Sequence, residues 1–331
     1  MDPHVSPDSA NCVSASPVAA APVAASPVCV VTVNGARLAY QEFGPSDAAT
    51  IVLVAGGASS MDWWDEEFCR QLAAGPVAAA AAVATATATA DRPRRVVRYD
   101  LRDTGQSETV APGQARYTGS DLVDDLAALI EHLHAAPAHV VGLSMGGALV
   151  QRLALRRPEL LASVTLVSTT SIGGSDSPLP PPVARLAASF DADPPVTDWS
   201  DPRSVAEAAL EAERLYSGSI PVDEVRIRRI ATAALARTGS PASADNHWSI
   251  DDGPASDAAS ASATDTVTPA HALPTLVIHG SDDPLFPLPH GVNLAESIDG
   301  ARLVVVPGMG HQFPPPPTWP QIVEAIRRHT A

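Results

Sequence analysis

The sequence predicts a doubly wound α/β domain with a mostly parallel sheet, and three observations support this fold class. Short runs of almost continuous Val, Ile and Leu recur along the chain, which is typical of strands buried on both faces of a parallel sheet. Helical segments alternate with those runs, as they do where helices cover both faces of a sheet. One long stretch, residues 172–248, lacks strand signals and indicates an insertion between two strands.

Strands and helices can be assigned in chain order from these patterns. Eight strands are expected, at residues 29–33, 38–43, 51–55, 95–99, 139–143, 164–168, 275–279 and 302–306. Two helices between them have clear end signals. Residues 120–134 have an N-cap candidate followed by acidic residues, whereas residues 145–157 stop at Pro158 with arginines in the last turn.

The insertion is expected to form a helical lid over residues 172–267. Its prolines come first, and helix-prone runs follow at residues 204–216 and 223–237. Ligands of open α/β sheets bind beyond the carboxyl ends of the strands, so an insertion there would cover the ligand site. The core is then expected to consist of residues 29–171 and 268–331.

Three segments have low-complexity sequences. Residues 1–28 repeat Ser-Pro-Val and Ala-Ala-Pro-Val and are expected to form a disordered tail. Residues 78–90 combine an alanine run with Ala-Thr alternation, and residues 255–263 are rich in Ala, Ser and Asp. Alanine and threonine bury too little apolar surface to hold a membrane span. We therefore expect two surface loops and no association with a membrane.

Composition excludes several classes of protein. The 331 residues include 37 acidic and 21 basic residues, so the basic stripe of a nucleic-acid-binding protein is missing. The chain has no lysine, which excludes Schiff-base and pyridoxal-phosphate enzymes, Ser-Lys hydrolases and P-loop nucleotidases. Its three cysteines lack metal-ligand spacing and predict neither a metal site nor disulfides. Because the first basic residue is Arg37, no secretory signal is indicated and a cytoplasmic location is expected.

A candidate nucleophile stands between a predicted strand and a predicted helix. The sequence Gly142-Leu-Ser-Met-Gly146 places Ser144 in a sharp strand-to-helix turn, the context of a nucleophile elbow. Such a turn is strained, and the residues two before and two after the serine must lack side chains. Both are glycine here. Ser144 is therefore the predicted nucleophile.

A serine hydroxyl needs a base within hydrogen-bond reach and a carboxylate that fixes the tautomer of that base. For a serine on an elbow, the acid and then the histidine follow along the chain. The strand at 275–279 runs into Gly280-Ser-Asp-Asp283, and the strand at 302–306 is followed by the glycine-rich loop that carries His311. His311 is the predicted base. Asp282 and Asp283 are both candidate acids, and the chemistry of the two residues alone does not choose between them.

The developing oxyanion needs two backbone N–H donors. One is expected from Met145, at the positive end of its helix, and the other from Gly57 in the loop after the third strand. Trp63 and Trp64 follow this loop and could wall a substrate pocket, although core packing is the ordinary role of such residues. No metal or organic cofactor is needed by this set of residues.

With these residues assigned, the chain resembles the α/β-hydrolase superfamily from about Cys29 to its end, and most of all its aclacinomycin methylesterase-like branch. The resemblance lies in Val54-Ala-Gly-Gly-Ala-Ser59, Arg98-Tyr-Asp-Leu-Arg-Asp-Thr-Gly-Gln-Ser107, Val140-Val-Gly-Leu-Ser-Met-Gly146, Thr275-Leu-Val-Ile-His279 and Pro307-Gly-Met-Gly-His311. It implies an α/β-hydrolase fold with Ser144 as nucleophile, His311 as base and Asp283 as acid. Two features depart from the pattern: Ala55-Gly56 stands where His-Gly is commoner, and residues 78–90 are extra.

The predicted function is that of a serine hydrolase that cleaves a carboxylic ester, with a methyl ester among the candidates, through an acyl-serine intermediate. Acyl transfer or perhydrolysis on the same three residues is one alternative. A ligand receptor with a hydrolase fold and little turnover is another. A small-molecule ester is the expected partner, nucleic acid is not, and the oligomeric state is left open. The resemblance disfavours haloalkane dehalogenases and epoxide hydrolases of this fold, because their nucleophile is an aspartate and position 144 is serine.

Overall fold

The computed structural model describes residues 23–74, 92–192, 197–251 and 273–331. Its eight-stranded sheet has the order β1-β2-β4-β3-β5-β6-β7-β8. The strands are β1 (Cys29–Val33), β2 (Ala36–Phe43), β3 (Thr50–Val54), β4 (Arg95–Tyr99), β5 (Ala138–Leu143), β6 (Leu161–Val167), β7 (Thr275–Gly280) and β8 (Arg302–Val306). β2 is antiparallel to β1 and β4, and the other neighbours are parallel. The predicted fold class, a mostly parallel α/β sheet, is confirmed.

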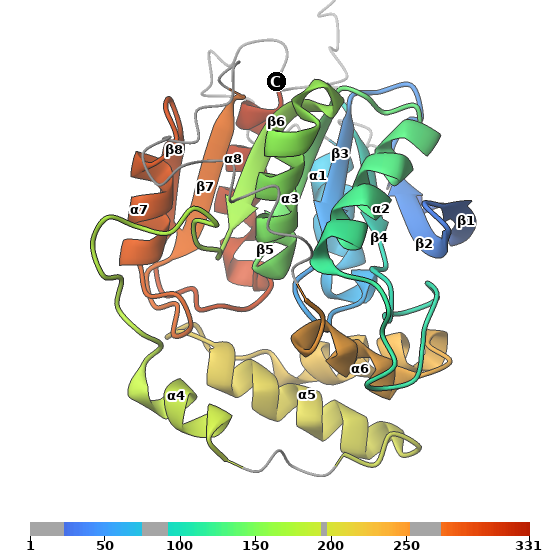
Figure 1. Ribbon diagram of the computed structural model, residues 1–331, viewed down its shortest axis with the longest axis vertical. Coiled ribbons are helices and arrows are strands. Elements are labelled where there is room, and N and C mark those ends of the chain that lie inside the picture. Colours follow the sequence, from blue (N-terminus) through green and yellow to red (C-terminus); the bar gives the residue numbers. More distant parts are fainter. Residues whose placement is uncertain (1–22, 75–91, 193–196, 252–272) are drawn as a thin grey trace, which may run out of the picture.

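Helices cover both faces of this sheet (Figure 1). One face packs against α2 (Gly119–His132), α3 (Met145–Arg156) and α7 (Pro289–Glu296), and the other against α1 (Glu66–Ala74) and α8 (Trp319–His329). Residues of β3 alternate between the two cores: Val52 and Val54 face the first, whereas Ile51 and Leu53 face the second. Burial on both faces explains why the strand runs are continuously apolar.

The ends of the two predicted helices follow from their capping residues. α2 begins at Gly119, one residue before the prediction, because Thr118 and Asp121 form a reciprocal capping box. α3 begins at Met145 and ends at Arg156, directly before the Arg157-Pro158 turn. The sequence signals therefore located both helices to within two residues at each end.

The inserted region contributes α4 (Ala184–Phe190), α5 (Pro202–Tyr216), α6 (Glu224–Arg237) and the short 3-10 helix η3 (Pro241–Trp248). The two predicted helical runs correspond to α5 and α6, which pack against each other. Figure 1 shows α4, α5 and α6 as a separate layer at the lower end of the sheet. We propose that this layer is the lid; its predicted limits, residues 172 and 267, stay a proposal.

The predicted low-complexity segments lie largely outside the described residues. This is so for residues 1–22 of the predicted tail and for the whole of 78–90 and 255–263. Of the remaining tail residues, Ala25 bridges to Phe43 and the Ser26 amide donates to the Glu42 carbonyl. The last part of the predicted tail therefore pairs with β2. No helix in the described part of the chain is long and apolar enough to cross a membrane.

Candidate active site

Ser144 occupies the single-residue turn between β5 and α3. Its φ of 52° and ψ of −117° form a strained conformation for a residue with a side chain. A Cβ atom on Gly142 would lie 2.4 Å from the Gly146 carbonyl oxygen, and one on Gly146 would lie 2.5 Å from that of Ala55. Both glycines are required because β5, the turn and the loop after β3 approach one another so closely. That loop, residues 55–59, is called the oxyanion loop below. The turn has the shape predicted for an elbow.

The structure brings the three predicted catalytic side chains together. His311 Nε2 lies 2.9 Å from Ser144 Oγ, and His311 Nδ1 lies 2.9 Å from the nearer oxygen of Asp283. Asp283 is 2% exposed and His311 8% exposed. Ser144, Asp283 and His311 follow β5, β7 and β8, and the carboxyl ends of these parallel strands meet at one edge of the sheet. The arrangement can deliver a proton from the serine to the histidine.

The two adjacent aspartates have different surroundings. Oδ1 of Asp283 accepts hydrogen bonds from the amides of Leu285 and Phe286, at 2.9 and 2.8 Å. These donors compensate the buried carboxylate and hold it toward His311. Asp282 is exposed and accepts a hydrogen bond from Ser281 Oγ, and hydrogen bonds from serine hydroxyls lower the pKa of its carboxyl. Of the two aspartates, Asp283 is the one that contacts the His311 imidazole.

Other side chains shape the surroundings of His311. The ring of Phe286 lies 5.2 Å from that of His311 in an edge-on contact, and the Tyr216 ring lies 5.9 Å away. His279 is fully buried behind Asp283, and its Nε2 donates to the Phe286 carbonyl. Burial lowers the pKa of His279, which favours a neutral ring beside the acid. These contacts limit the access of water to the Asp283–His311 pair.

The loop after β3 passes beside the serine, where the oxyanion donors were expected. A Cβ atom on Gly56 would lie 3.6 Å from the Cβ of Ser144. Among the hydrogen bonds of the described residues, none has the Gly57 or Met145 amide as donor. Met145 is also the first residue of α3, so the positive end of that helix lies at the site. Within the described part of the chain, both amides are therefore unpaired donors beside Ser144.

Of the two tryptophans that follow the oxyanion loop, Trp64 has the core-packing role that is ordinary for such residues and not that of a pocket wall. Trp64 is 1% exposed and packs with Phe68 and Phe313, and Trp63 stacks on Phe313. Trp64 is therefore a core residue. The aromatic residue at the loop is Trp248, which is 68% exposed and whose ring would lie 2.6 Å from a Cβ atom on Gly57. Nothing in the local sequence singled it out, because η3 has no strand before it and no periodic pattern.

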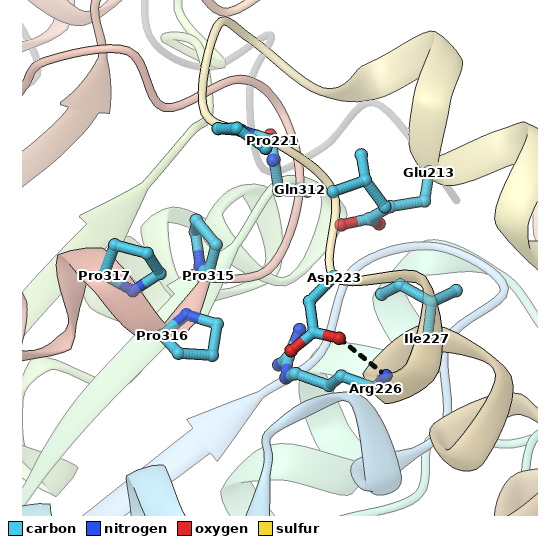
Figure 2. Close-up of a pocket in the computed structure, with 10 residues that line it drawn as sticks. Glu213, Pro221, Asp223, Arg226, Ile227, Gln312, Pro315, Pro316 and Pro317 are labelled. Atoms are coloured by element: carbon cyan, nitrogen blue, oxygen red, sulfur yellow. Dashed lines mark hydrogen bonds between the residues drawn. The ribbon is translucent and has the colours of Figure 1, made fainter.

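A cavity of about 180 Å³ lies against α5, α6 and the segment that follows His311. It is lined by Glu213, Pro221, Val222, Asp223, Arg226, Ile227, Gln312, Pro315, Pro316 and Pro317. Figure 2 shows the Glu213 carboxylate facing Gln312, with Asp223 Oδ1 accepting from the Arg226 amide at the start of α6. Gln312 follows His311 in the chain, but Ser144, Asp283 and His311 do not line this cavity. It is therefore separate from the candidate active site.

We expect Glu213 to make the stability of the protein depend on pH. Burial raises the pKa of its carboxyl to about 7, and the charge of Arg226 offsets this rise only in part. The folded state keeps a proton that the unfolded state releases near pH 4.5, so stability is lost as pH rises toward 7. Glu213→Gln is expected to become increasingly more stable than the wild type between pH 5 and pH 8. Urea unfolding at both pH values measures this difference.

The matched control for this prediction is Glu211→Gln. Glu211 lies on the same helix, with a side chain that is 64% exposed and paired with Arg214. Its stability difference from the wild type should stay constant between the two pH values. If the Glu213→Gln difference also stayed constant, the assignment of a raised pKa to Glu213 would be wrong.

No group of three or more His, Cys, Asp or Glu side chains within the described ranges is placed to hold a metal ion. The polar groups at the site are the Ser144 hydroxyl, the His311 imidazole, the Asp283 carboxylate and two backbone amides that have no hydrogen-bond partner among the described residues. This combination supports attack on a carbonyl carbon.

Comparisons with known proteins place the chain in a family. Residues 49–314 match the model of the α/β-hydrolase fold family. The chain is 30% identical to rhodomycin D methylesterase DauP of Streptomyces sp. (strain C5) over 305 residues, which cover 86% of this chain and 92% of the relative. Rhodomycin D methylesterase DnrP of Streptomyces peucetius is also 30% identical, over 86% of this chain and 92% of that protein.

Solved structures agree on the fold. Esterase RhEst1 from Rhodococcus sp. ECU1013 aligns with a TM-score of 0.64 and 20% identity, over 93% of this chain and 98% of that one. The family and the methylesterase likeness predicted from the sequence are both confirmed. The chain belongs to the α/β-hydrolase fold family.

Proposed function

We propose that the chain is a serine hydrolase that cleaves a carboxylic ester, a methyl ester above all, through an acyl-serine intermediate. One observation carries the proposal: the His311 ring bridges Ser144 Oγ and the Asp283 carboxylate, with both contacts at 2.9 Å. The likeness to the two rhodomycin D methylesterases supports the choice of a methyl ester. A cytoplasmic location and a reaction without metal or organic cofactor stay predictions from the sequence.

The reaction starts when His311 Nε2 takes the Ser144 proton as Oγ attacks the ester carbonyl carbon. Asp283 holds the imidazole in the tautomer with a proton on Nδ1 and stabilises the imidazolium that forms. The Gly57 and Met145 amides donate to the oxyanion. His311 then gives its proton to the departing alkoxide, and an acyl-serine remains. Water attacks that ester with the same histidine as base, and the carboxylic acid leaves.

The test is steady-state hydrolysis of methyl, aryl and lactone esters in water enriched in oxygen-18. Turnover of methyl esters, with one labelled oxygen in each acid formed, is the expected result. Added alcohol or hydrogen peroxide competes with water for the acyl-serine, so a new ester or a peracid as main product would favour acyl transfer or perhydrolysis. Labelling of Ser144 by a fluorophosphonate, without turnover of any ester, would favour a receptor and contradict the proposal.

A further inference from the structure

His247 joins the end of the inserted region to the oxyanion loop. It lies in the last turn of η3 and is 5% exposed. Its Nε2 lies 2.7 Å from the Arg102 carbonyl oxygen, and its Nδ1 lies 2.9 Å from the Ala58 amide nitrogen. A carbonyl oxygen only accepts, so Nε2 carries the proton and Nδ1 offers a lone pair to the amide. The contacts therefore require a neutral ring in one tautomer, and burial, which lowers the pKa of His247, favours it.

The hydrogen bond to Ala58 constrains the peptide unit that follows Gly57. Ala58 has a φ of 56°, an uncommon conformation for a residue with a side chain. The same peptide unit is held at its other end, because Ser59 Oγ donates to the Gly57 carbonyl at 3.2 Å. Glycine has more backbone freedom than any other residue. The Gly57 N–H belongs to the preceding peptide unit. Holding the Gly57–Ala58 unit on both sides restricts the rotation of the Gly57 backbone, and so restricts the direction of its N–H.

The residues beside His247 are also held in place by contacts with other parts of the chain. Asn246, which is 1% exposed, accepts a hydrogen bond from the Gly113 amide at 2.7 Å and donates to Asp103 at 2.9 Å. Trp248, on the other side of His247, lies with its ring against Gly57. The segment 246–248 thus contacts the oxyanion loop and two parts of the loop that follows β4.

We propose that His247 is a positioning residue for the oxyanion hole, which it fixes by accepting the Ala58 amide hydrogen bond. This inference rests on the proposed function, because it assigns the Gly57 amide to the oxyanion. His247 lies on η3 and touches neither Ser144 nor His311 through any hydrogen bond of the described residues. A substitution of His247 should therefore change the reaction rate only through the stabilisation of charge that develops on the carbonyl oxygen.

His247→Phe removes both hydrogen bonds but keeps a planar ring, whereas His247→Asn keeps an acceptor near the position of Nδ1. We expect His247→Phe to lower kcat by about 10- to 100-fold, which does not exceed the effect of removing a whole oxyanion donor. KM should stay within about threefold of the wild-type value. His247→Asn should stay within about threefold of the wild type. A thionoester places sulfur in the oxyanion hole, and sulfur is a poorer hydrogen-bond acceptor than oxygen. His247→Phe should therefore slow the hydrolysis of thionoesters much less than that of the matching esters.

The matched control is His139→Phe. His139 is partly buried and also hydrogen-bonded, to Ser163, but it lies at the opposite end of β5 from Ser144. We expect this variant to leave kcat and the ester-to-thionoester rate ratio unchanged. Equal losses for His247→Phe and His247→Asn, or equal losses on esters and thionoesters, would overturn the proposal.

Hydrogen exchange separates this inference from the function on which it rests. In His247→Phe, the Ala58 amide should exchange at least about tenfold faster than in the wild type, and in His139→Phe it should not. Unchanged exchange at Ala58 would overturn the positioning role whatever the activity. Absence of ester turnover in the wild type would contradict the proposed function alone. If His247→Phe fails to fold, His247→Gln replaces it, since its amide reaches toward Arg102 and not toward Ala58.

Discussion

Ser144→Ala is expected to lower kcat for ester hydrolysis by about 10⁴-fold or more, because the variant has no nucleophile to form the acyl-enzyme. The fold should be retained, since the Ser144 side chain contacts the protein through His311 and its backbone bonds do not depend on the hydroxyl. Steady-state kinetics on the best ester measures the loss, and circular dichroism checks the fold.

The matched control is Ser168→Ala. Ser168 follows β6, the strand beside β5, is fully buried, and also has a positive φ. Its hydroxyl has no hydrogen-bond partner in the part of the chain that the structure describes. We expect kcat within about threefold of the wild type for this variant. Near wild-type turnover in Ser144→Ala would refute the mechanism.

Asp283→Asn is expected to lower kcat by on the order of 10³ to 10⁴. The amide would offer an N–H group to His311 Nδ1 and so favour the tautomer that cannot accept the Ser144 proton. It would also stabilise the imidazolium less. Asp282→Asn should cost less than about tenfold, because Asp282 is exposed and bonded to Ser281 rather than to the imidazole.

The pair of aspartate variants is a close comparison, since the two positions are adjacent and the substitution is the same. Both proteins are compared by kcat on one ester and by thermal unfolding. A larger loss in Asp282→Asn than in Asp283→Asn would move the catalytic acid to position 282.

Much of the fold could be predicted because the residue pattern of each segment agrees with the place of that segment in the sheet. The strand runs are continuously apolar, and the structure buries them on both faces; β3 and β7 are buried at every residue. The sequence also explains Gly142 and Gly146, because the sharp turn at Ser144 leaves no room for side chains at these two positions. Their close contacts with neighbouring backbone agree with this. The placement of the serine, acid and histidine after three parallel strands follows from the same pattern.

The parts that could not be predicted depend on contacts between distant segments. His247 and Trp248 reach the oxyanion loop from about 190 positions further along the chain, and no short-range spacing encodes that approach. Gly57 illustrates the same limit: it was expected as an oxyanion donor, but the ring of Trp248 also leaves no room for a side chain there. For Trp64 the sequence left a pocket wall and core packing open, with core packing as the default, and its contacts with Phe68 and Phe313 agree with the core.

The most direct test of the central claim is to trap the acyl-enzyme. The wild-type protein is mixed with an ester of a bulky, slowly deacylating acid, quenched in acid within the first turnovers, and measured by intact mass spectrometry and peptide mapping. We predict a mass increase equal to one acyl group, located on the peptide that carries Ser144 and absent from Ser144→Ala. Ester turnover without any adduct, or with an adduct on another residue, would contradict the account.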